Sequence, residues 1–405
     1  MTGRLVLAAL LGGSCAMAQS LAGLWDATVQ VNGREIPFRM EFAGAGSSVS
    51  GSFFNGDEKV ASTGGRFENG SLVLSFDYYG SRLEAAWQDG VLDGAYRRDG
   101  RTYPFHAQRF VPSPLTAADV PSIAGLWEVG VSSSKTESAW RLIVRQSGPE
   151  VSAAILRVDG DTGSLTGAWR GGKFVLSHFD GARPSLFEVT PQKDGSLEVV
   201  QNGRRMIALR SADARAKGLP EPADPSRHTS VKDPTEPLHF HFPDLNGHMV
   251  SDSDALFAGK VVIVAIGGTW CPNCHDEAPF LVELYRRYHS QGLEIVALDF
   301  EDAEHLRDPV RVRAFIQRYG IEYPVLLAGE TGELNAKMPQ AVNLNAYPTT
   351  FYLGRDGCVR SVHAGFAGAA AGEFHQQLKE DVTKLLERLL AEKASPPASS
   401  ARDLR

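Results

Sequence analysis

The sequence predicts a multidomain protein in which a duplicated antiparallel β module, closed into a barrel or a sandwich, precedes an α/β domain. Residues 21–25 (LAGLW) recur as residues 123–127 (IAGLW), 102 positions later (123 − 21). A proline-rich segment at 211–237 ends the repeated half, and after residue 238 strand-like and helix-like apolar stretches alternate. The chain of 405 residues is long enough for two or three such domains.

The two β repeats are expected at residues 19–110 and 111–210. At the same offset, residues 70–75 (GSLVLS) match residues 172–177 (GKFVLS). Short alternating apolar stretches, such as residues 38–42, are broken by Gly, Asn and Asp, which is typical of meandering antiparallel strands. This pattern predicts one barrel or sandwich per repeat.

The opening of each repeat, Gly-x-Trp, resembles the first strand of lipocalin-like barrels, in which the tryptophan plugs one end of the barrel. Trp25 and Trp127 take this place. A ligand cavity is one reading, but barrels of this size are more often filled by side chains. His106 and His178 are isolated, so no catalytic group is expected in this half.

The first 18 residues read as an export signal. Arg4 precedes an apolar run at 5–11, and Ala16-Met17-Ala18 fits the small-x-small cleavage rule. The expected location is therefore periplasmic or otherwise exported. Cys15 leaves a lipid anchor as the alternative, which is the one route by which a membrane partner is expected. A net charge of −7 does not indicate nucleic-acid binding.

Two segments lack the composition to bury a core. Residues 211–237 are expected to be an extended linker because five prolines stand there among charged and small residues: Pro220, Pro222, Pro225, Pro234 and Pro237. Residues 394–405 are expected to be a disordered tail.

Residues 238–393 have the element order of a thioredoxin fold. The continuous apolar run at 261–266 predicts a buried central strand, and a helix follows the cysteine pair. A second strand is expected at 293–298, and a hairpin is expected to join 350–353 to 359–362. Strand–helix–strand followed by helix–hairpin–helix gives an α/β thioredoxin fold.

The motif WCPNCH carries the chemistry of this domain. Its cysteines, Cys271 and Cys274, follow the central strand and open a helix. A helix N-terminus favours thiolate, so Cys271 is expected to be the attacking thiol and Cys274, one turn later, the resolving thiol. Cys-x-x-Cys-His is also a haem-attachment motif, with His275 and Met338 as conceivable axial ligands.

Further motifs resemble the TlpA/ResA group of thioredoxin-like thiol–disulfide oxidoreductases. They are FPDLNG at 242–247, GKVV at 259–262, TWCPNC at 269–274 and YPTT at 347–350. The resemblance implies reduction of protein disulfides, with cytochrome c maturation as one setting. It also implies partners: protein disulfide substrates and an upstream thiol donor.

The resemblance assigns further site residues. Pro348 is expected to be a cis proline that presents the backbone of Tyr347 to a substrate chain, beside Trp270 and Pro272. Glu277 is expected to hold the proton of Cys274; a carboxylate that only suits the helix dipole is the alternative.

The sequence departs from the group at three places. Ala265 replaces a polar or acidic residue on the central strand, Gly267-Gly268 replaces bulkier residues, and Tyr347 is larger than usual. The first change weakens any claim about a second proton acceptor. The third change bears on substrate choice.

Other readings of the remaining residues stay open. Cys358 is expected to be an inert core thiol, with a regulatory disulfide as the sharper alternative. His275 is expected to be exposed.

A peroxiredoxin-like peroxidase is an alternative function, although Gly268 stands where that family has threonine. A β module that binds a ligand or partner, with an auxiliary redox domain, is the other rival. No metal site and no cofactor are expected.

Overall fold

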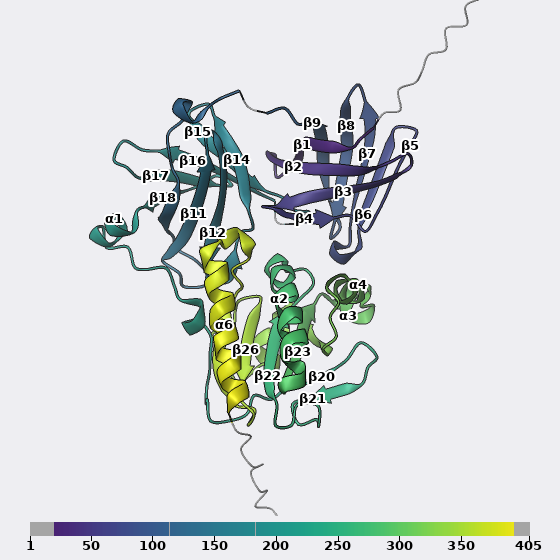
Figure 1. Cartoon of the computed structure of the whole chain (residues 1–405), viewed down its shortest axis with the longest axis vertical. Helices are drawn as coiled ribbons and strands as arrows, with labels where there is room; N and C mark the ends of the chain where they lie inside the picture. Colours follow the sequence, from purple (N-terminus) through teal and green to yellow (C-terminus); the bar gives the residue numbers. More distant parts are fainter. Residues whose placement is uncertain (1–19, 113, 183, 393–405) are drawn as a thin grey trace, which may run out of the picture.

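The computed structural model describes residues 20–112, 114–182 and 184–392. The predicted signal peptide with Cys15, and the predicted tail at 394–405, lie outside the described residues. Two β barrels lie side by side and both rest on the third unit (Figure 1). Among the described residues, no helix is long and apolar enough to cross a membrane.

The first barrel closes because β2 pairs with β3 as well as β1. Eight strands form the ring in the order β2-β1-β9-β8-β7-β6-β5-β3, and β4 pairs with β3 outside the ring. The strands are β1 (Gly23–Val31), β2 (Arg34–Ala45), β3 (Ser48–Asn55), β4 (Glu58–Ala61), β5 (Gly64–Glu68), β6 (Ser71–Phe76), β7 (Ser81–Gln88), β8 (Val91–Arg98) and β9 (Arg101–Arg109), with the turn η1 (Asp77–Tyr79).

The second barrel repeats this topology, with β11 pairing with both β10 and β12. Its strands are β10 (Gly125–Gly130), β11 (Ala139–Ser147), β12 (Glu150–Arg157), β13 (Gly160–Asp161), β14 (Leu165–Arg170), β15 (Lys173–His178), β16 (Ser185–Pro191), β17 (Leu197–Gln201) and β18 (Arg204–Leu209), preceded by η2 (Ala117–Asp119). The predicted duplicated β module is thus a pair of closed barrels.

The repeated tryptophans are held in the same way in both barrels. The indole N–H donates to the carbonyl four residues upstream, at 2.9 Å in Trp25 and 2.8 Å in Trp127. An arginine covers each ring: Arg109, at the end of β9, lies 4.7 Å from the centroid, and Arg210, directly after β18, lies 3.6 Å from it. Each barrel end is therefore closed by one tryptophan–arginine pair.

The other end of the first barrel is plugged from outside. Phe179, in the loop after β15 of the second barrel, is 2% exposed and belongs to the core of the first barrel. Its ring lies 4.6 Å from Phe38, 5.3 Å from Phe53 and 5.2 Å from Tyr96. Side chains fill the interior, so the barrel is a packed core.

The third unit is a thioredoxin-like α/β domain. Its sheet has the order β24-β23-β22-β26-β27, with β22, β23 and β24 parallel and the last two strands antiparallel. The strands are β22 (Val261–Gly267), β23 (Leu293–Glu301), β24 (Val325–Glu330), β26 (Thr349–Leu353) and β27 (Val359–Ala364). The helices are α2 (Pro272–Tyr288), α3 (Ala303–Arg307), α4 (Val310–Tyr319), α5 (Leu334–Lys337) and α6 (Glu373–Ala391), with η4 (His289–Gln291), η5 (Thr331–Glu333) and η6 (Ala369–Ala371).

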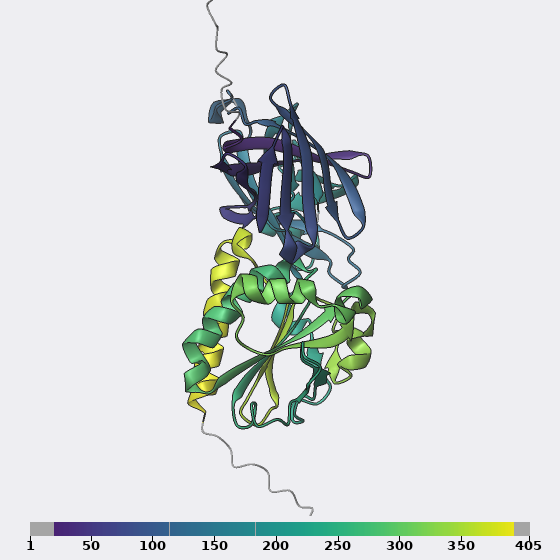
Figure 2. The ribbon, with the colours of Figure 1, turned by 90° about the vertical axis from the view of Figure 1, so that its right-hand side faces the viewer.

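Elements cover both faces of this sheet (Figure 2). Odd-numbered residues of β22, such as Ile263, pack with apolar residues of α2, α4 and α6. Even-numbered residues, such as Val264, pack with α5 and with the hairpin of β20 (His241–Pro243) and β21 (Met249–Ser251). The central strand is buried on both sides, as its apolar run predicts.

The segment predicted to be an extended linker is docked on its neighbours. It begins with the short helix α1 (Ser211–Ala216) and continues through η3 (Pro225–Arg227). Its strand β19 (Ser230–Val231) then pairs with β25 (Ala341–Val342) of the thioredoxin-like domain. Backbone pairing of this kind has no apolar period, so the composition of the segment does not reveal it.

Candidate redox site

The cysteine pair lies where the central strand passes into α2. Cys271 is the N-cap of this helix and Pro272 is its first residue. The backbone N–H of Cys274 donates to the Sγ of Cys271 at 3.4 Å. An anion at this position is stabilised by the free N–H groups and the positive end of the helix dipole, so the geometry suits a nucleophilic thiolate.

The two glycines before the motif have separate roles. A Cβ on Gly268 would lie 2.4 Å from the Nε1 of Trp270 and 2.5 Å from the carbonyl oxygen of Phe300. The Trp270 indole donates to that carbonyl at 2.8 Å. Gly268 is thus required for the close approach of Trp270, whereas a Cβ on Gly267 would make only ordinary contact with Cys274.

The proline loop faces the cysteines. The peptide bond between Tyr347 and Pro348 is cis, as predicted. The Tyr347 ring lies 5.0 Å from the Trp270 ring, edge to face. Burial, and after it the charges of Cys274 and Cys271, raise the pKa of Tyr347, so this side chain stays neutral and borders both thiols.

Glu277 is a buried acid one turn after Cys274. Its Oε1 accepts a hydrogen bond from the Thr350 hydroxyl at 2.7 Å. Burial raises the pKa of Glu277 to about 7, and the hydrogen bond from Thr350 opposes the rise. Burial also raises the pKa of Cys274, with smaller contributions from Cys271 and from the charge of Glu277. A carboxyl that titrates near neutral pH can take and return the proton of a resolving thiol.

A buried ionic network that the sequence did not reveal holds the start of the motif. The Glu301 carboxylate accepts from the backbone N–H of Thr269 at 2.5 Å and from its hydroxyl at 2.7 Å. Arg311 bonds the same hydroxyl at 2.7 Å and Glu301 at 2.6 Å. Asp299, on the same strand as Glu301, has one buried oxygen without a hydrogen-bond partner, and burial raises its pKa.

Known proteins resemble this chain through this domain. The profile of the AhpC/TSA family matches residues 235–362. The thiol-disulfide oxidoreductase ResA of Geobacillus kaustophilus is 31% identical over 150 residues, covering 37% of this chain and 74% of that protein. ResA of Bacillus subtilis is 30% identical over 136 residues, covering 34% of this chain and 69% of that protein.

The chain belongs to the ResA family of thiol–disulfide oxidoreductases. It is accordingly a thiol–disulfide oxidoreductase of the thioredoxin-like class. A thiol:disulfide interchange protein of the thioredoxin family from Chlorobium tepidum is 25% identical in its solved structure, which covers 40% of this chain and 99% of that chain with a TM-score of 0.30.

His275 is buried in this ResA-family member, although the sequence predicted an exposed side chain. Its Nδ1 lies 2.9 Å from the Tyr319 hydroxyl and its Nε2 lies 2.8 Å from the Thr269 carbonyl. Burial lowers the pKa of His275 to about 3, so the ring is neutral. Because both ring nitrogens are engaged and Met338 is a core residue 1% exposed, neither side chain is placed to ligate a haem.

Cys358 lies away from the redox pair. It is 8% exposed, stands at the turn of the β26–β27 hairpin, and donates its S–H to the carbonyl of Thr235 at 3.2 Å. Pro348 stands at the opposite end of β26. Burial raises the pKa of Cys358, which favours the inert thiol over the regulatory disulfide.

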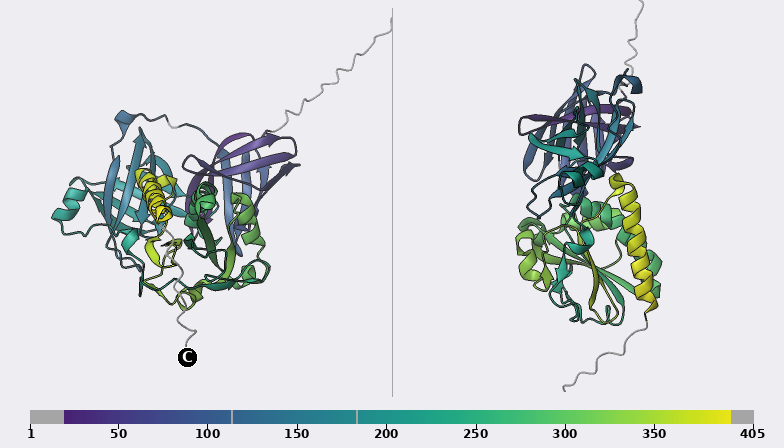
Figure 3. Two further views of the ribbon diagram at one scale, coloured as in Figure 1. Left: turned by 60° about the horizontal axis from the view of Figure 1, so that its bottom comes forward. Right: turned by 90° about the vertical axis from the view of Figure 1, so that its left-hand side faces the viewer.

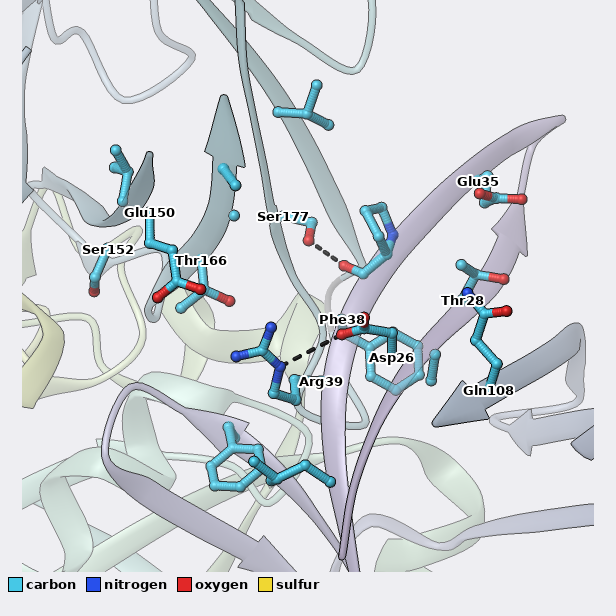
Figure 4. A pocket seen from close by; sticks show the side chains of 18 of the residues that line it. Asp26, Thr28, Glu35, Phe38, Arg39, Gln108, Glu150, Ser152, Thr166 and Ser177 are labelled. Carbon is cyan, nitrogen blue, oxygen red and sulfur yellow. Dashed lines mark hydrogen bonds and ion pairs between the residues drawn. The ribbon is translucent and has the colours of Figure 1, made fainter. Parts of the chain in front are cut away.

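A cleft of about 1050 Å³ lies between the outer faces of the two barrels. Figure 4 shows Asp26, Thr28 and Arg39 of the first barrel on one side, and Glu150 and Thr166 of the second on the other. None of the residues that line the cleft belongs to the redox motif. A cavity inside a barrel was the expected alternative; the hollow lies between the barrels instead.

Proposed function

We propose that this chain is an exported oxidoreductase that reduces disulfides of protein substrates through Cys271 and Cys274. The observation that carries the proposal is the position of Cys271 at the N-cap of α2, with Cys274 one turn behind it and Glu277 buried next to Cys274. The resemblance to ResA supports the same chemistry.

The reaction takes two steps. The Cys271 thiolate attacks one sulfur of the substrate disulfide, which forms a mixed disulfide and releases the other substrate sulfur as a thiolate that takes a proton from water. Cys274, after giving its proton to Glu277, then attacks the sulfur of Cys271, which breaks the mixed disulfide, leaves a Cys271–Cys274 disulfide and releases the second substrate sulfur as a thiolate. That thiolate takes up the proton held by Glu277. The substrate has gained two electrons and two protons. A protein dithiol upstream is needed to reduce the pair again.

The first test is the reduction potential of the pair in glutathione or dithiothreitol buffers. We expect a value near or below about −250 mV, as for reductants such as thioredoxin. A value near about −120 mV would make the chain a disulfide donor and reverse the proposed direction. Cys358→Ser is the matched control, because that thiol lies outside the site and its loss should leave the potential unchanged.

A second candidate is a peroxidase, which the match to the AhpC/TSA profile favours. Reduced protein is mixed with hydrogen peroxide and, separately, with insulin. Fast loss of peroxide with no insulin reduction would favour the peroxidase. Insulin reduction that Cys274→Ser stops at a trapped mixed disulfide would favour the proposed oxidoreductase.

The remaining alternative gives the β barrels the main role, with the redox domain as an auxiliary. The cleft between the barrels is the feature that favours it. A Cys271→Ser variant that still binds a cellular target unchanged would support independent barrels.

Cell fractionation tests the proposed export, which rests on the first 18 residues.

A further inference from the structure

The redox motif is covered by the chain's own barrels. Cys271 is 1% exposed and Cys274 is 7% exposed. Figure 3 shows both barrels seated against the end of the thioredoxin-like domain where α2 begins. We call the covering segments the cap: residues 156–163 of the second barrel, and residues 78–79 and 98–99 of the first.

The second barrel touches the dipeptide between the cysteines with its backbone. The Asn273 side chain donates to the carbonyl of Asp159 at 2.7 Å. At Gly160 a Cβ would lie 2.2 Å from that Asn273 nitrogen and 2.4 Å from the carbonyl oxygen of Phe366. Asp161 then accepts from the backbone N–H of Gly368 at 2.7 Å. No space remains here for another polypeptide.

The cap also covers the loop with the cis proline. Val158, 1% exposed, packs with Ala346 and Ala364, both 0% exposed. Ala346 directly precedes the Tyr347–Pro348 bond, where the resemblance places the pairing edge for a substrate chain. The second barrel therefore lies where a substrate is expected to pair.

The first barrel closes the opposite side. The Tyr79 ring lies 4.7 Å from the His275 ring, and the Arg318 guanidinium lies 3.8 Å over the Tyr78 ring. Arg98 donates to the carbonyl of Trp270 at 3.4 Å. These contacts come from η1 and the end of β8, so both barrels take part in the cover.

We propose that this arrangement is the closed state of a gated enzyme, in which the cap takes the place of a substrate protein on the redox site. Residues 156–163 act as an internal pseudosubstrate, and the barrels move away from the thioredoxin-like domain before Cys271 attacks a disulfide. The inference rests on the proposed function, because a thiol that reacts with a protein disulfide requires access. The cap holds the redox end through single hydrogen bonds, a ring contact with His275 and small apolar clusters, and domains joined in this way commonly move relative to one another.

The test measures thiol access in the reduced full-length protein. Iodoacetamide alkylation is followed for each cysteine peptide by mass spectrometry, in native buffer and in urea. We expect Cys271 to react at least about tenfold more slowly in the native protein than in urea, since opening must precede reaction. A native rate equal to the urea rate would overturn the proposal outright.

Variants of the cap sharpen the test. Arg98→Ala removes the bond to Trp270, and Asp161→Ala removes the bond to Gly368. Each is expected to raise the native alkylation rate of Cys271 by about three- to tenfold, corresponding to loss of the one hydrogen bond that each side chain makes to the thioredoxin-like domain. Arg97→Ala and Asp194→Ala are the matched controls, because these side chains are exposed and lie outside the cap.

Cys358 reports on folding in the same samples. It is buried and remote from the cap, so its rate should stay constant when only the cap opens. Unchanged protection of Cys271 in both cap variants, or an equal rise at Cys358, would contradict selective opening. Alkylation reads access and not turnover, so a failure of insulin reduction would reject the proposed function and leave this result standing.

Discussion

The first barrel and the redox end of the thioredoxin-like domain differ in the kind of side chain that they bury. The first barrel is filled by apolar and aromatic side chains, with Trp25, Phe42, Phe53 and Phe76 at most 1% exposed. The redox end buries ionisable groups instead: His275, Glu277, Asp299, Glu301 and Arg311 are each at most 6% exposed. Apolar burial stabilises a fold at every pH, whereas a buried carboxyl costs stability once it ionises. The core of the first barrel therefore contributes stability at every pH, while the redox end loses some stability so that its acids can hold and release protons.

The largest effect is expected from the tryptophans that close the barrels. Trp25→Ala and Trp127→Ala should each lower the free energy of unfolding by about 4 kcal/mol, because a large buried ring is lost from a packed core. The loss should be the same at pH 5 and pH 8 in urea unfolding. Leu24→Ala and Leu126→Ala are equivalent controls, each 38% exposed. A strong pH dependence of the loss would contradict the view that these cores are stabilised by apolar burial alone.

The plug between the barrels should come next. Phe179→Ala should cost about 3 kcal/mol, although the affected core belongs to the first barrel. Hydrogen exchange should accelerate in β3 of the first barrel. Phe174→Ala, in the core of the second barrel, is the control and should accelerate exchange there. Exchange that stays slow in β3 would show that the first barrel closes without the plug.

At the redox end, Glu277→Gln should stabilise the protein above neutral pH. The pKa of Glu277 rises from its ordinary 4.5 to about 7 in the folded chain. Its carboxyl binds a proton on folding, so the native state loses stability as pH rises from 4.5 to 7. The full cost is about 3 kcal/mol. The variant should gain this at pH 8 and nothing at pH 4, in urea unfolding.

The control for this prediction lies on the same helix. Glu283 is about half exposed and pairs with Lys379 on the surface. Glu283→Gln should therefore change stability by less than about 1 kcal/mol at either pH. An equal gain from both variants would show that the burial of Glu277 is not the cause.

The smallest effect is expected from the arginines over the tryptophans. Arg109→Lys and Arg210→Lys keep the charge but lose the planar contact with the ring and one of the two carbonyl bonds. Each should cost about 1 kcal/mol. Arg97→Lys, at an exposed ion pair, is the control. Unequal losses of stability in the two variants would show that the arginine stabilises the tryptophan differently in the two barrels.

Local patterns predict much of the fold and of the site. The repeat spacing predicts two β units, and the pattern around Cys271 predicts the strand, the turn and the helix that the structure contains. The cis bond at Pro348 follows from the resemblance and is present, whereas the role of Glu277 stays a prediction. The strand, the turn and the helix can be predicted because each one depends on a few neighbouring residues.

Contacts across long distances in the sequence could not be predicted. Asp159 meets Asn273 across 114 residues, and Arg98 meets Trp270 across 172. No periodicity marks such pairs, because each depends on how whole domains pack. The prediction that His275 is exposed was wrong for the same reason, because Tyr79 covers its ring from another domain. Asp299 and Arg311 look like surface charges until the sheet and α4 are placed around them.

The plug at Phe179 also orders events during synthesis. The last strand of the first barrel ends at Arg109, so the ring that completes its core is made 70 residues later (179 − 109). At ribosomal rates of about 5–20 residues per second, the open end waits roughly 4 to 14 s for Phe179. During that interval Phe38, Phe53 and Tyr96 lack their partner. Until residue 179 has been made, one end of the first barrel therefore has an unfilled aromatic opening.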